Sequence, residues 1–192
     1  MKKQLKDLVT LIGGYAFKSE LYKDSGIRVI RIANVQDGYI SDEYPCYYPV
    51  TYKNEIGQAM LKENDLLMSL TGNVGRVAFL TKDMLPAGLN QRVECLRTSN
   101  NLLKRYLYFY FRSKKFIDDA IKNSSGIAQL NMSTKWLGDY EIMIYDVNKM
   151  SKICDELESL STAINNKHNE LKHYDELIKS RFICQEALNE IC

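Results

Sequence analysis

Residues 71–76, Thr-Gly-Asn-Val-Gly-Arg, have the glycine spacing of a loop that could bind a phosphate. A P-loop requires Lys and then Ser or Thr after its last glycine, because the Lys contacts the phosphates and the hydroxyl binds magnesium. Arg76 and Val77 occupy those positions here. A dinucleotide-binding loop requires a third glycine at the start of a helix, whereas the residues that follow have a strand pattern. The stretch therefore predicts a tight turn between two strands, with the glycines adopting positive φ.

The rest of the sequence contains no recognisable catalytic constellation. It has no H-E-x-x-H or G-x-S-x-G motif, and both histidines, His168 and His173, fall in the long C-terminal helix predicted below. An Asn-Pro-Pro-aromatic methyltransferase motif is excluded, because the three prolines are Pro45, Pro49 and Pro86. The five cysteines are scattered without a C-x-x-C pair, which argues against a disulfide framework and a zinc site. We therefore expect a binding protein that is not an enzyme and needs no cofactor or metal ion.

Several loops combine amide, hydroxyl and cationic side chains, the groups that bind DNA base edges and phosphates. Residues 10–19 include two adjacent glycines that allow close approach of the backbone. Residues 90–92 are Asn-Gln-Arg, and residues 124–131 are mostly small and polar. Each feature also has a structural explanation. Asn-Gln-Arg equally suits a turn network, the two glycines suit a turn, and the abundant tyrosines more often pack than contact nucleic acid.

Short strands and few long helices are expected to position these loops. Alternating or apolar runs predict strands at 27–32, 65–70, 76–80, 93–97 and 141–145. One helix is expected from an N-cap at Asn100 or Asn101 to about Lys122, where Ser-Ser-Gly ends it. The pattern up to residue 146 is therefore that of an α+β domain with mixed short strands.

From Val147 to about Glu190 the sequence has no glycine or proline and shows a heptad repeat. The repeated positions are Met150, Leu157, Ile164, Leu171 and Ile178, with Ile153, Leu160 and Tyr174 in the second seam. This register predicts a coiled-coil helix with Asp146 as its N-cap. A helix packed on its own domain is the alternative. However, about 40 residues form a rod of about 60 Å, whereas a domain of this size has a radius of gyration near 15 Å, so we expect a second helix to cover it.

Composition and charge narrow the class of partner only a little. The chain has no run of about 18 apolar residues and no apolar signal core at its N-terminus, so we expect no membrane span and no secretory signal. Scattered reduced cysteines suit a cytoplasmic location. Residues 1–146 hold 20 Lys and Arg against 16 Asp and Glu, a net +4, and residues 147–192 hold 6 against 8, a net −2. The mildly basic first part permits an anionic partner without requiring one.

Taken together, the sequence resembles the specificity (S) subunit of type I restriction–modification systems. The stretches that carry this resemblance are GGYAFKSELYKDSGIRVIRIANV, ENDLLMSLTGNVGRVAFL, GLNQRVECLR, YLYFYFRSKKF, SSGIAQLNMSTKWLGDYEI and ICDELESLSTAINNKHNELKHYDELIKSRF. Their order resembles one target recognition domain, here 1–146, followed by one conserved helical region for dimerisation or spacing, here 147–192. In that family T-G-x-x-G is a recurrent β-turn, which implies a scaffold role for residues 71–75.

The resemblance implies sequence-specific recognition of double-stranded DNA without catalysis. Such subunits direct methyltransferase (modification) and motor–nuclease (restriction) subunits to a split DNA site. They usually carry two recognition domains and two helical regions, so this chain corresponds to half a subunit. Two copies paired through their helices would form a homodimer that recognises an interrupted palindrome.

The expected DNA contacts are Lys18, Ser19, Asn34, Thr71, Asn73, Gln91, Arg92, Gln129 and Lys135, with Tyr39 and Tyr44 as secondary candidates. The expected dimer interface consists of Met150, Leu157, Leu160, Ile164, Leu171, Tyr174 and Ile178.

Two other interpretations stay open. A coiled-coil protein-interaction adaptor that does not bind DNA would have a salt-insensitive partner and no basic patch around the loops at 13–19, 71–76 and 90–92. A recognition domain detached from a single-chain restriction enzyme would not need a symmetric helix pair. The chain also departs from the family pattern, because residues 145–150 lack the proline and acidic-Gln step that often precede the helix.

Overall fold

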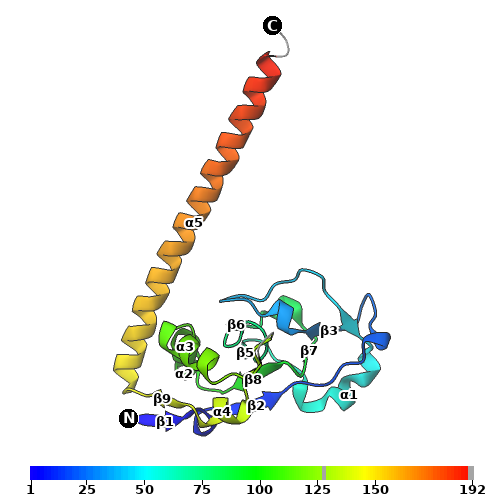
Figure 1. The fold of residues 1–192 in the computed structure, drawn as a ribbon, viewed down its shortest axis with the longest axis vertical. Coiled ribbons are helices and arrows are strands. Elements are labelled where there is room, and N and C mark those ends of the chain that lie inside the picture. The colour runs from blue at the N-terminus through cyan, green and yellow to red at the C-terminus, as the bar shows by residue number, and fades with distance from the viewer. Residues whose placement is uncertain (127–128, 190–192) are drawn as a thin grey trace. The chain divides into compact units, whose positions relative to one another are not determined.

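A computed structural model describes the backbone of residues 1–126 and 129–189 and the side chains of residues 1–126 and 129–181. The chain divides into two compact units, Met1–Met150 and Ser151–Cys192. The first unit contains three small sheets with short helices, and a single long helix forms the second (Figure 1). The predicted α+β class with a long C-terminal helix is confirmed.

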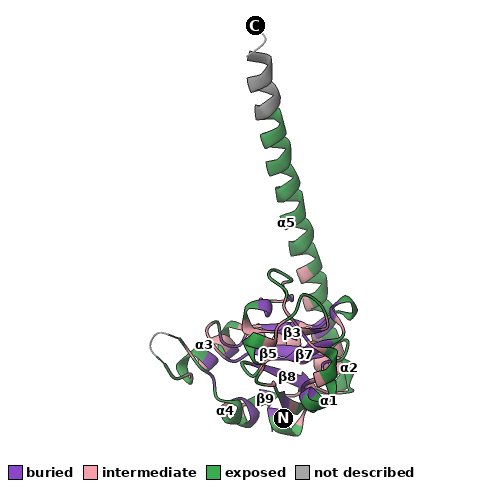
Figure 2. Ribbon diagram, turned by 90° about the vertical axis from the view of Figure 1, so that its right-hand side faces the viewer, coloured by how far each residue is buried: buried purple, intermediate pink, exposed green. Residues whose placement is uncertain are grey.

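A four-stranded antiparallel sheet supports most of the loops of interest. Its strand order is β2 (Thr10–Gly13), β8 (Val93–Arg97), β5 (Leu66–Ser69) and β6 (Val77–Phe79). All four residues of β5 are buried, which explains the unbroken apolar run in its sequence (Figure 2). The strands predicted at 65–70, 76–80 and 93–97 are confirmed.

The second sheet has the order β4 (Tyr47–Tyr48), β3 (Ile27–Ile30) and β7 (Ala87–Leu89), with β3 parallel to β7. Strand β3 ends at Ile30, earlier than predicted, because the chain turns into a 3-10 helix after Arg31. A two-stranded sheet pairs β1 (Lys2–Gln4) with β9 (Glu141–Met143), so both ends of the first unit lie side by side. Buried side chains from β3, β7 and β8 form one core with Tyr48.

Short helices fill the connections of the first unit. The α-helices are α1 (Lys53–Ile56), α2 (Asn101–Phe111), α3 (Lys114–Lys122) and α4 (Thr134–Asp139). The 3-10 helices are η1 (Leu5–Asp7), η2 (Ser19–Leu21), η3 (Ile32–Asn34), η4 (Val50–Tyr52), η5 (Gly57–Ala59) and η6 (Lys82–Met84).

The single helix predicted from residue 100 to 122 is wrong, because the structure has two helices there. Asn100 caps α2 as expected, accepting a hydrogen bond from the Leu103 N–H at 2.9 Å. At Ser113 the backbone is extended, and the hydroxyl accepts a hydrogen bond from the Phe116 N–H at 3.3 Å. Ser113 therefore acts as the N-cap of a new helix instead of continuing α2.

Helix α5 (Val147–Asn189) begins where the sequence predicts. The Asp146 Oδ1 accepts a hydrogen bond from the Lys149 N–H at 3.0 Å, which confirms the predicted N-cap. Met150 is buried and belongs to the first unit, so it is better explained as a core residue than as the predicted interface residue. Leu157 is half-buried, whereas the later heptad residues are 55–61% exposed, namely Leu160, Ile164, Leu171, Tyr174 and Ile178. The predicted helix end at Glu190 lies outside the described residues.

Candidate nucleic-acid interface

The turn at residues 71–76 joins β5 to β6. Gly72 and Gly75 have φ of 72° and 81°, which confirms the predicted use of glycine. The buried Ser69 fixes the turn through two hydrogen bonds. Its hydroxyl donates to the Asn73 carbonyl at 2.5 Å, and its carbonyl accepts from the Gly75 N–H at 2.9 Å. The Asn73 side chain is exposed on a turn whose backbone is held in place.

The segment at residues 129–132 lies beside this turn. The Leu130 carbonyl accepts a hydrogen bond from the Gly72 N–H at 2.8 Å, and the Met132 N–H donates to the Leu70 carbonyl at 2.7 Å. The Thr71 hydroxyl also lies 3.1 Å from the Asn131 Oδ1. These contacts place Gln129 next to the turn. The other part of this predicted loop, Ile127 and Ala128, lies outside the described residues.

The Asn-Gln-Arg segment at 90–92 lies on the other side of Leu70, whose N–H donates to the Arg92 carbonyl at 3.0 Å. Gln91 and Arg92 are exposed, whereas Asn90 has the structural role, since its side chain accepts from the Arg92 N–H at 3.3 Å. A Cβ atom on Gly14 would lie 2.1 Å from the Asn90 carbonyl group, so glycine is needed here for packing against the 90–92 segment. The turn interpretation is therefore confirmed for Asn90, whereas DNA contact by the exposed Gln91 and Arg92 stays a prediction.

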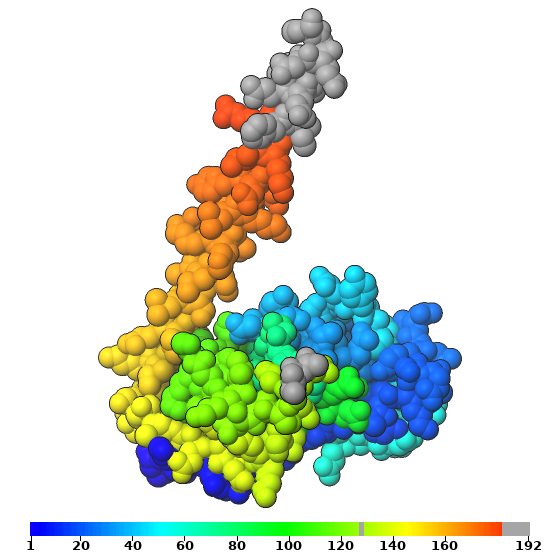
Figure 3. Space-filling view, in the orientation of Figure 1, coloured from blue at the N-terminus to red at the C-terminus, as the bar shows by residue number. Residues whose placement is uncertain are grey.

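The turn, Gln129 and residues of the segment 32–36 line a hollow of about 180 Å³. Its polar lining includes Gln36, Thr71, Asn73, Arg76 and Gln129. The Arg76 guanidinium donates to the Gln36 Oε1 at 2.6 Å. Gln36 is neutral, and Arg76 forms no ion pair with any residue that the structure describes. The segments that contribute these residues, drawn in light blue, blue-green and yellow-green, lie on one face of the first unit (Figure 3).

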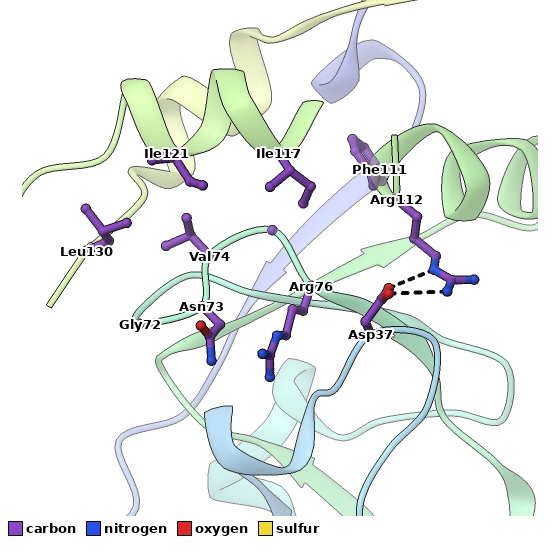
Figure 4. Close-up of a pocket in the computed structure, with 11 residues that line it drawn as sticks. Asp37, Gly72, Asn73, Val74, Arg76, Phe111, Arg112, Ile117, Ile121 and Leu130 are labelled. Atoms are coloured by element: carbon purple, nitrogen blue, oxygen red, sulfur yellow. Dashed lines mark hydrogen bonds and ion pairs between the residues drawn. The ribbon is translucent and has the colours of Figure 1, made fainter. Parts of the chain in front are cut away.

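The other side of the same turn borders a larger pocket of about 390 Å³ (Figure 4). Apolar side chains of α2 and α3, including Phe111, Ile117 and Ile121, form one wall. Asp37 and Arg112, which form an ion pair at 2.7 Å, line the pocket beside Phe111 (Figure 4). Both sides of the turn therefore combine polar groups with apolar side chains, since Ile32, Ala33 and Val35 also line the smaller hollow.

Not all predicted contact residues lie together. Thr71, Asn73 and Gln129 line the smaller hollow, and Gln91 and Arg92 belong to the neighbouring segment. Lys18 and Ser19 are exposed at the start of η2, away from the hollow's lining.

Asn34 does not suit a DNA contact in this structure. It is buried, its Oδ1 accepts from the Arg31 N–H at 2.9 Å, and its Nδ2 donates to the Ser41 carbonyl at 3.0 Å. The sequence analysis missed Gln36 and Arg76. The position of Arg76 directly after the second glycine was a usable signal, whereas nothing local marks Gln36.

Lys135 lines a separate shallow cavity with Lys6, Glu94 and Asp139. Lys6 and Asp139 form an ion pair at 2.6 Å. Glu94 is only 3% exposed, and its Oε2 has no hydrogen-bond partner in the part of the chain that the structure describes. Burial raises the pKa of Glu94 to about 7.

We expect Glu94→Gln to stabilise the protein in a pH-dependent way. The folded pKa of about 7 exceeds the reference value of 4.5, so the folded state binds the proton more strongly and loses stability as pH rises between these values. Removing the charge should raise the free energy of unfolding by up to about 3 kcal/mol near pH 8 and hardly change it near pH 4. Urea unfolding at both pH values measures this, with the exposed Glu63→Gln as a control. An equal gain at both pH values would contradict it.

Among the described residues, none of the helices is long and apolar enough to cross a membrane, and no cluster of metal-ligating side chains is present. The chemistry of the hollow is therefore that of amide, hydroxyl and guanidinium groups, which donate to and accept from base edges and bind phosphates.

Comparison with known proteins yields one family and several relatives. The family model for the type I restriction modification DNA specificity domain matches residues 1–173. The type I restriction enzyme MjaVIII specificity subunit of Methanocaldococcus jannaschii is 25% identical over 181 residues, which cover 92% of this chain and 43% of that protein. The EcoAI specificity subunit of Escherichia coli is 27% identical over 168 residues, 84% of this chain and 28% of that protein. The chain thus spans less than half the length of these relatives.

Solved structures show the same fold at low sequence identity. The HsdS subunit from Thermoanaerobacter tengcongensis superposes with a TM-score of 0.62 at 15% identity, over 86% of this chain and 38% of that one. The S subunit of the type I restriction–modification system from M. genitalium gives 0.59 at 16% identity, over 86% and 40%.

Proposed function

This chain belongs to the type I restriction–modification DNA specificity domain family, and we propose that it recognises a specific DNA sequence through the surface around the turn at 71–76. The observation that carries the proposal is the convergence of separate chain segments on one small hollow lined by amide, hydroxyl and guanidinium groups. Buried strands and main-chain hydrogen bonds fix these segments, so the polar groups are positioned before DNA binds.

The side chains divide by chemistry into two sets. Thr71, Asn73, Gln91 and Gln129 carry hydroxyl and amide groups suited to base edges. Lys18, Arg92 and Lys135 carry exposed charges suited to phosphates, and their contribution should fall as salt rises. Ser19 can donate to a phosphate beside Lys18. Asn34 is not retained, because its amide group is used within the fold.

The proposal extends to the assembly. The exposed apolar residues of α5 would pair with the same residues of a second copy, giving two recognition units related by a two-fold axis. Such a dimer would recognise two inverted half-sites separated by a fixed spacer. It would direct modification and restriction subunits to that site and would not itself be catalytic.

The test is selection of binding sequences from a random duplex library, using the full chain together with its modification subunit. We expect an enriched motif with two inverted halves. Asn73→Ala should weaken binding to that motif at least about ten-fold, whereas Asn54→Ala, which removes an exposed amide on α1, should not. Failure of any sequence to be enriched would refute DNA recognition and favour a protein-interaction adaptor.

A further inference from the structure

The loop at residues 36–44, called the tyrosine loop here, exposes two aromatic side chains. Tyr39 is 62% exposed and Tyr44 is 84% exposed. Neither ring has a hydrogen bond or a ring contact among the described residues, so the fold itself does not use them. Large aromatic side chains in such positions are candidates for contact with a partner.

The backbone at Tyr44 is in an unusual conformation. Its φ of 55° lies in the left-handed region, which a tyrosine adopts only at a free-energy cost. Among the described non-glycine residues, Asn64 is the one other with positive φ, and asparagine tolerates that region well. The strain at Tyr44 persists because neighbouring groups fix the chain. The Arg31 Nη2 donates to the Tyr44 carbonyl at 2.7 Å.

The first half of the tyrosine loop is fixed by two arginines from other elements. Arg76 donates to Gln36 at 2.6 Å, and Arg112, directly after α2, binds both carboxylate oxygens of Asp37 at 2.7 and 3.3 Å (Figure 4). Arg112 also donates to the Tyr108 hydroxyl at 2.8 Å, which sets the orientation of its guanidinium. The start of the tyrosine loop is therefore attached to the β5–β6 turn and to the end of α2.

Gly38 packs directly against this arrangement. Its φ is 91°, and a Cβ atom there would lie 3.0 Å from the Tyr108 hydroxyl and 3.3 Å from Arg112. Its N–H donates to the Val77 carbonyl at 2.9 Å, so the tyrosine loop is also bonded to β6. Tyr39 follows this fixed glycine.

The charges around the tyrosine loop favour an anionic partner. Asp37 pairs with Arg112 and Asp42 pairs with Arg28, so these four charges cancel. Arg31 donates to a carbonyl and Arg76 to an amide, and neither forms an ion pair with a residue that the structure describes. Glu43 opposes them as one exposed acid.

We propose that the tyrosine loop is a second DNA-contacting element, in which Tyr39 and Tyr44 contact bases or sugars and the Asp37–Arg112 ion pair positions them. The inference rests on the proposed DNA recognition and adds residues outside the hollow. Contacts to the sugars of a duplex carry no sequence information directly, so these tyrosines contribute mainly affinity. Gln36 belongs to both surfaces, which makes them continuous.

The role of the aromatic rings is tested with Tyr39→Ala and Tyr44→Gly in the full chain with its modification subunit. Glycine tolerates positive φ, so Tyr44→Gly should keep or raise thermal stability while weakening binding to the selected duplex roughly ten-fold. Tyr44→Phe should bind like the wild type. Unchanged DNA affinity in both tyrosine variants would overturn the proposal, as would a loss confined to binding of the modification subunit.

The positioning role of Asp37 is tested by removing its charge, because the two hypotheses predict opposite changes in DNA affinity. Simple electrostatics predicts that removing an acid near DNA tightens binding. If the ion pair positions the tyrosine loop, Asp37→Ala should instead weaken binding several-fold. Glu43→Ala, which removes the same charge from the same loop without breaking an ion pair among the described residues, should leave binding unchanged or tighter. Tighter binding by both variants would refute the positioning role.

These outcomes are separable from failure of the proposed function. If the wild-type protein enriches no DNA sequence, DNA recognition itself is refuted. If it enriches a motif that the tyrosine variants bind equally well, recognition stands and only the role of the tyrosine loop is refuted.

Discussion

Ile164→Asp is expected to convert the protein from a dimer to a monomer in solution. Ile164 is 56% exposed in the single chain, in the middle of the apolar seam of α5. In a paired helix its side chain would face the same seam of the second copy, and an aspartate there would bury an unpaired charge on each helix. That penalty is about 3–5 kcal/mol, or a roughly 10²- to 10⁴-fold weaker association. Light scattering at tens of micromolar measures the mass directly.

The matched control is Asn169→Asp, which adds the same side chain on the opposite face of α5. It should remain dimeric, because residue 169 lies well outside the heptad seam. Ile164 is also a better choice than Leu157, because Ile164 is 56% exposed in the single chain whereas Leu157 is half-buried. A wild-type protein that is monomeric would refute the homodimer, and a dimer unaffected by Ile164→Asp would place the interface elsewhere.

Local sequence patterns predicted much of this fold because they depend on contacts close in the chain. The heptad repeat and the Asp146 cap predicted the start of α5, and alternation predicted β8 to the residue. The predicted helix through 122 failed at Ser113. The helical spacing of apolar residues continues past Ser113. Only the extended backbone of Ser113 and its hydrogen bond from the Phe116 N–H show that a second helix starts there.

The candidate site was less predictable, because it is assembled from segments distant in sequence. The T-G-x-x-G turn could be predicted, since glycine spacing reports local φ values. Whether Asn34 is exposed depends on Ser41 and Arg31, and no sequence pattern records those contacts. Gln36 enters the hollow through its bond to Arg76, 40 residues away in sequence. The heptad position of Met150 is compatible both with a helix-pair interface and with the core of the first unit. Only its burial in the tertiary structure shows that it belongs to the core.

The two ends of the β5–β8 strand pair have different roles. One end carries the candidate interface, and the other carries an ion pair that stabilises the sheet. Ser69 pairs with Val93 at the end that carries the turn at 71–76 and the segment at 90–92. At the other end Leu66 pairs with Leu96, and beyond it Asp65 and Arg97 form an ion pair. The Arg97 Nε and Nη2 donate to the two carboxylate oxygens of Asp65 at 2.9 and 2.5 Å. Because this pair lies away from the candidate interface, a substitution there tests the scaffold alone.

Arg97→Met is accordingly expected to lower the free energy of unfolding by about 3–5 kcal/mol without changing the DNA affinity of the folded protein. The Asp65 side chain is 5% exposed, and although it would keep the hydrogen bond from the Lys62 N–H at 2.7 Å, its buried charge would lose its counterion. Urea unfolding measures the loss. Adding Asp65→Leu should recover most of it, because the double variant buries no unpaired charge. If the double variant were as unstable as Arg97→Met, packing of the Arg97 side chain rather than its charge would stabilise this end of the sheet.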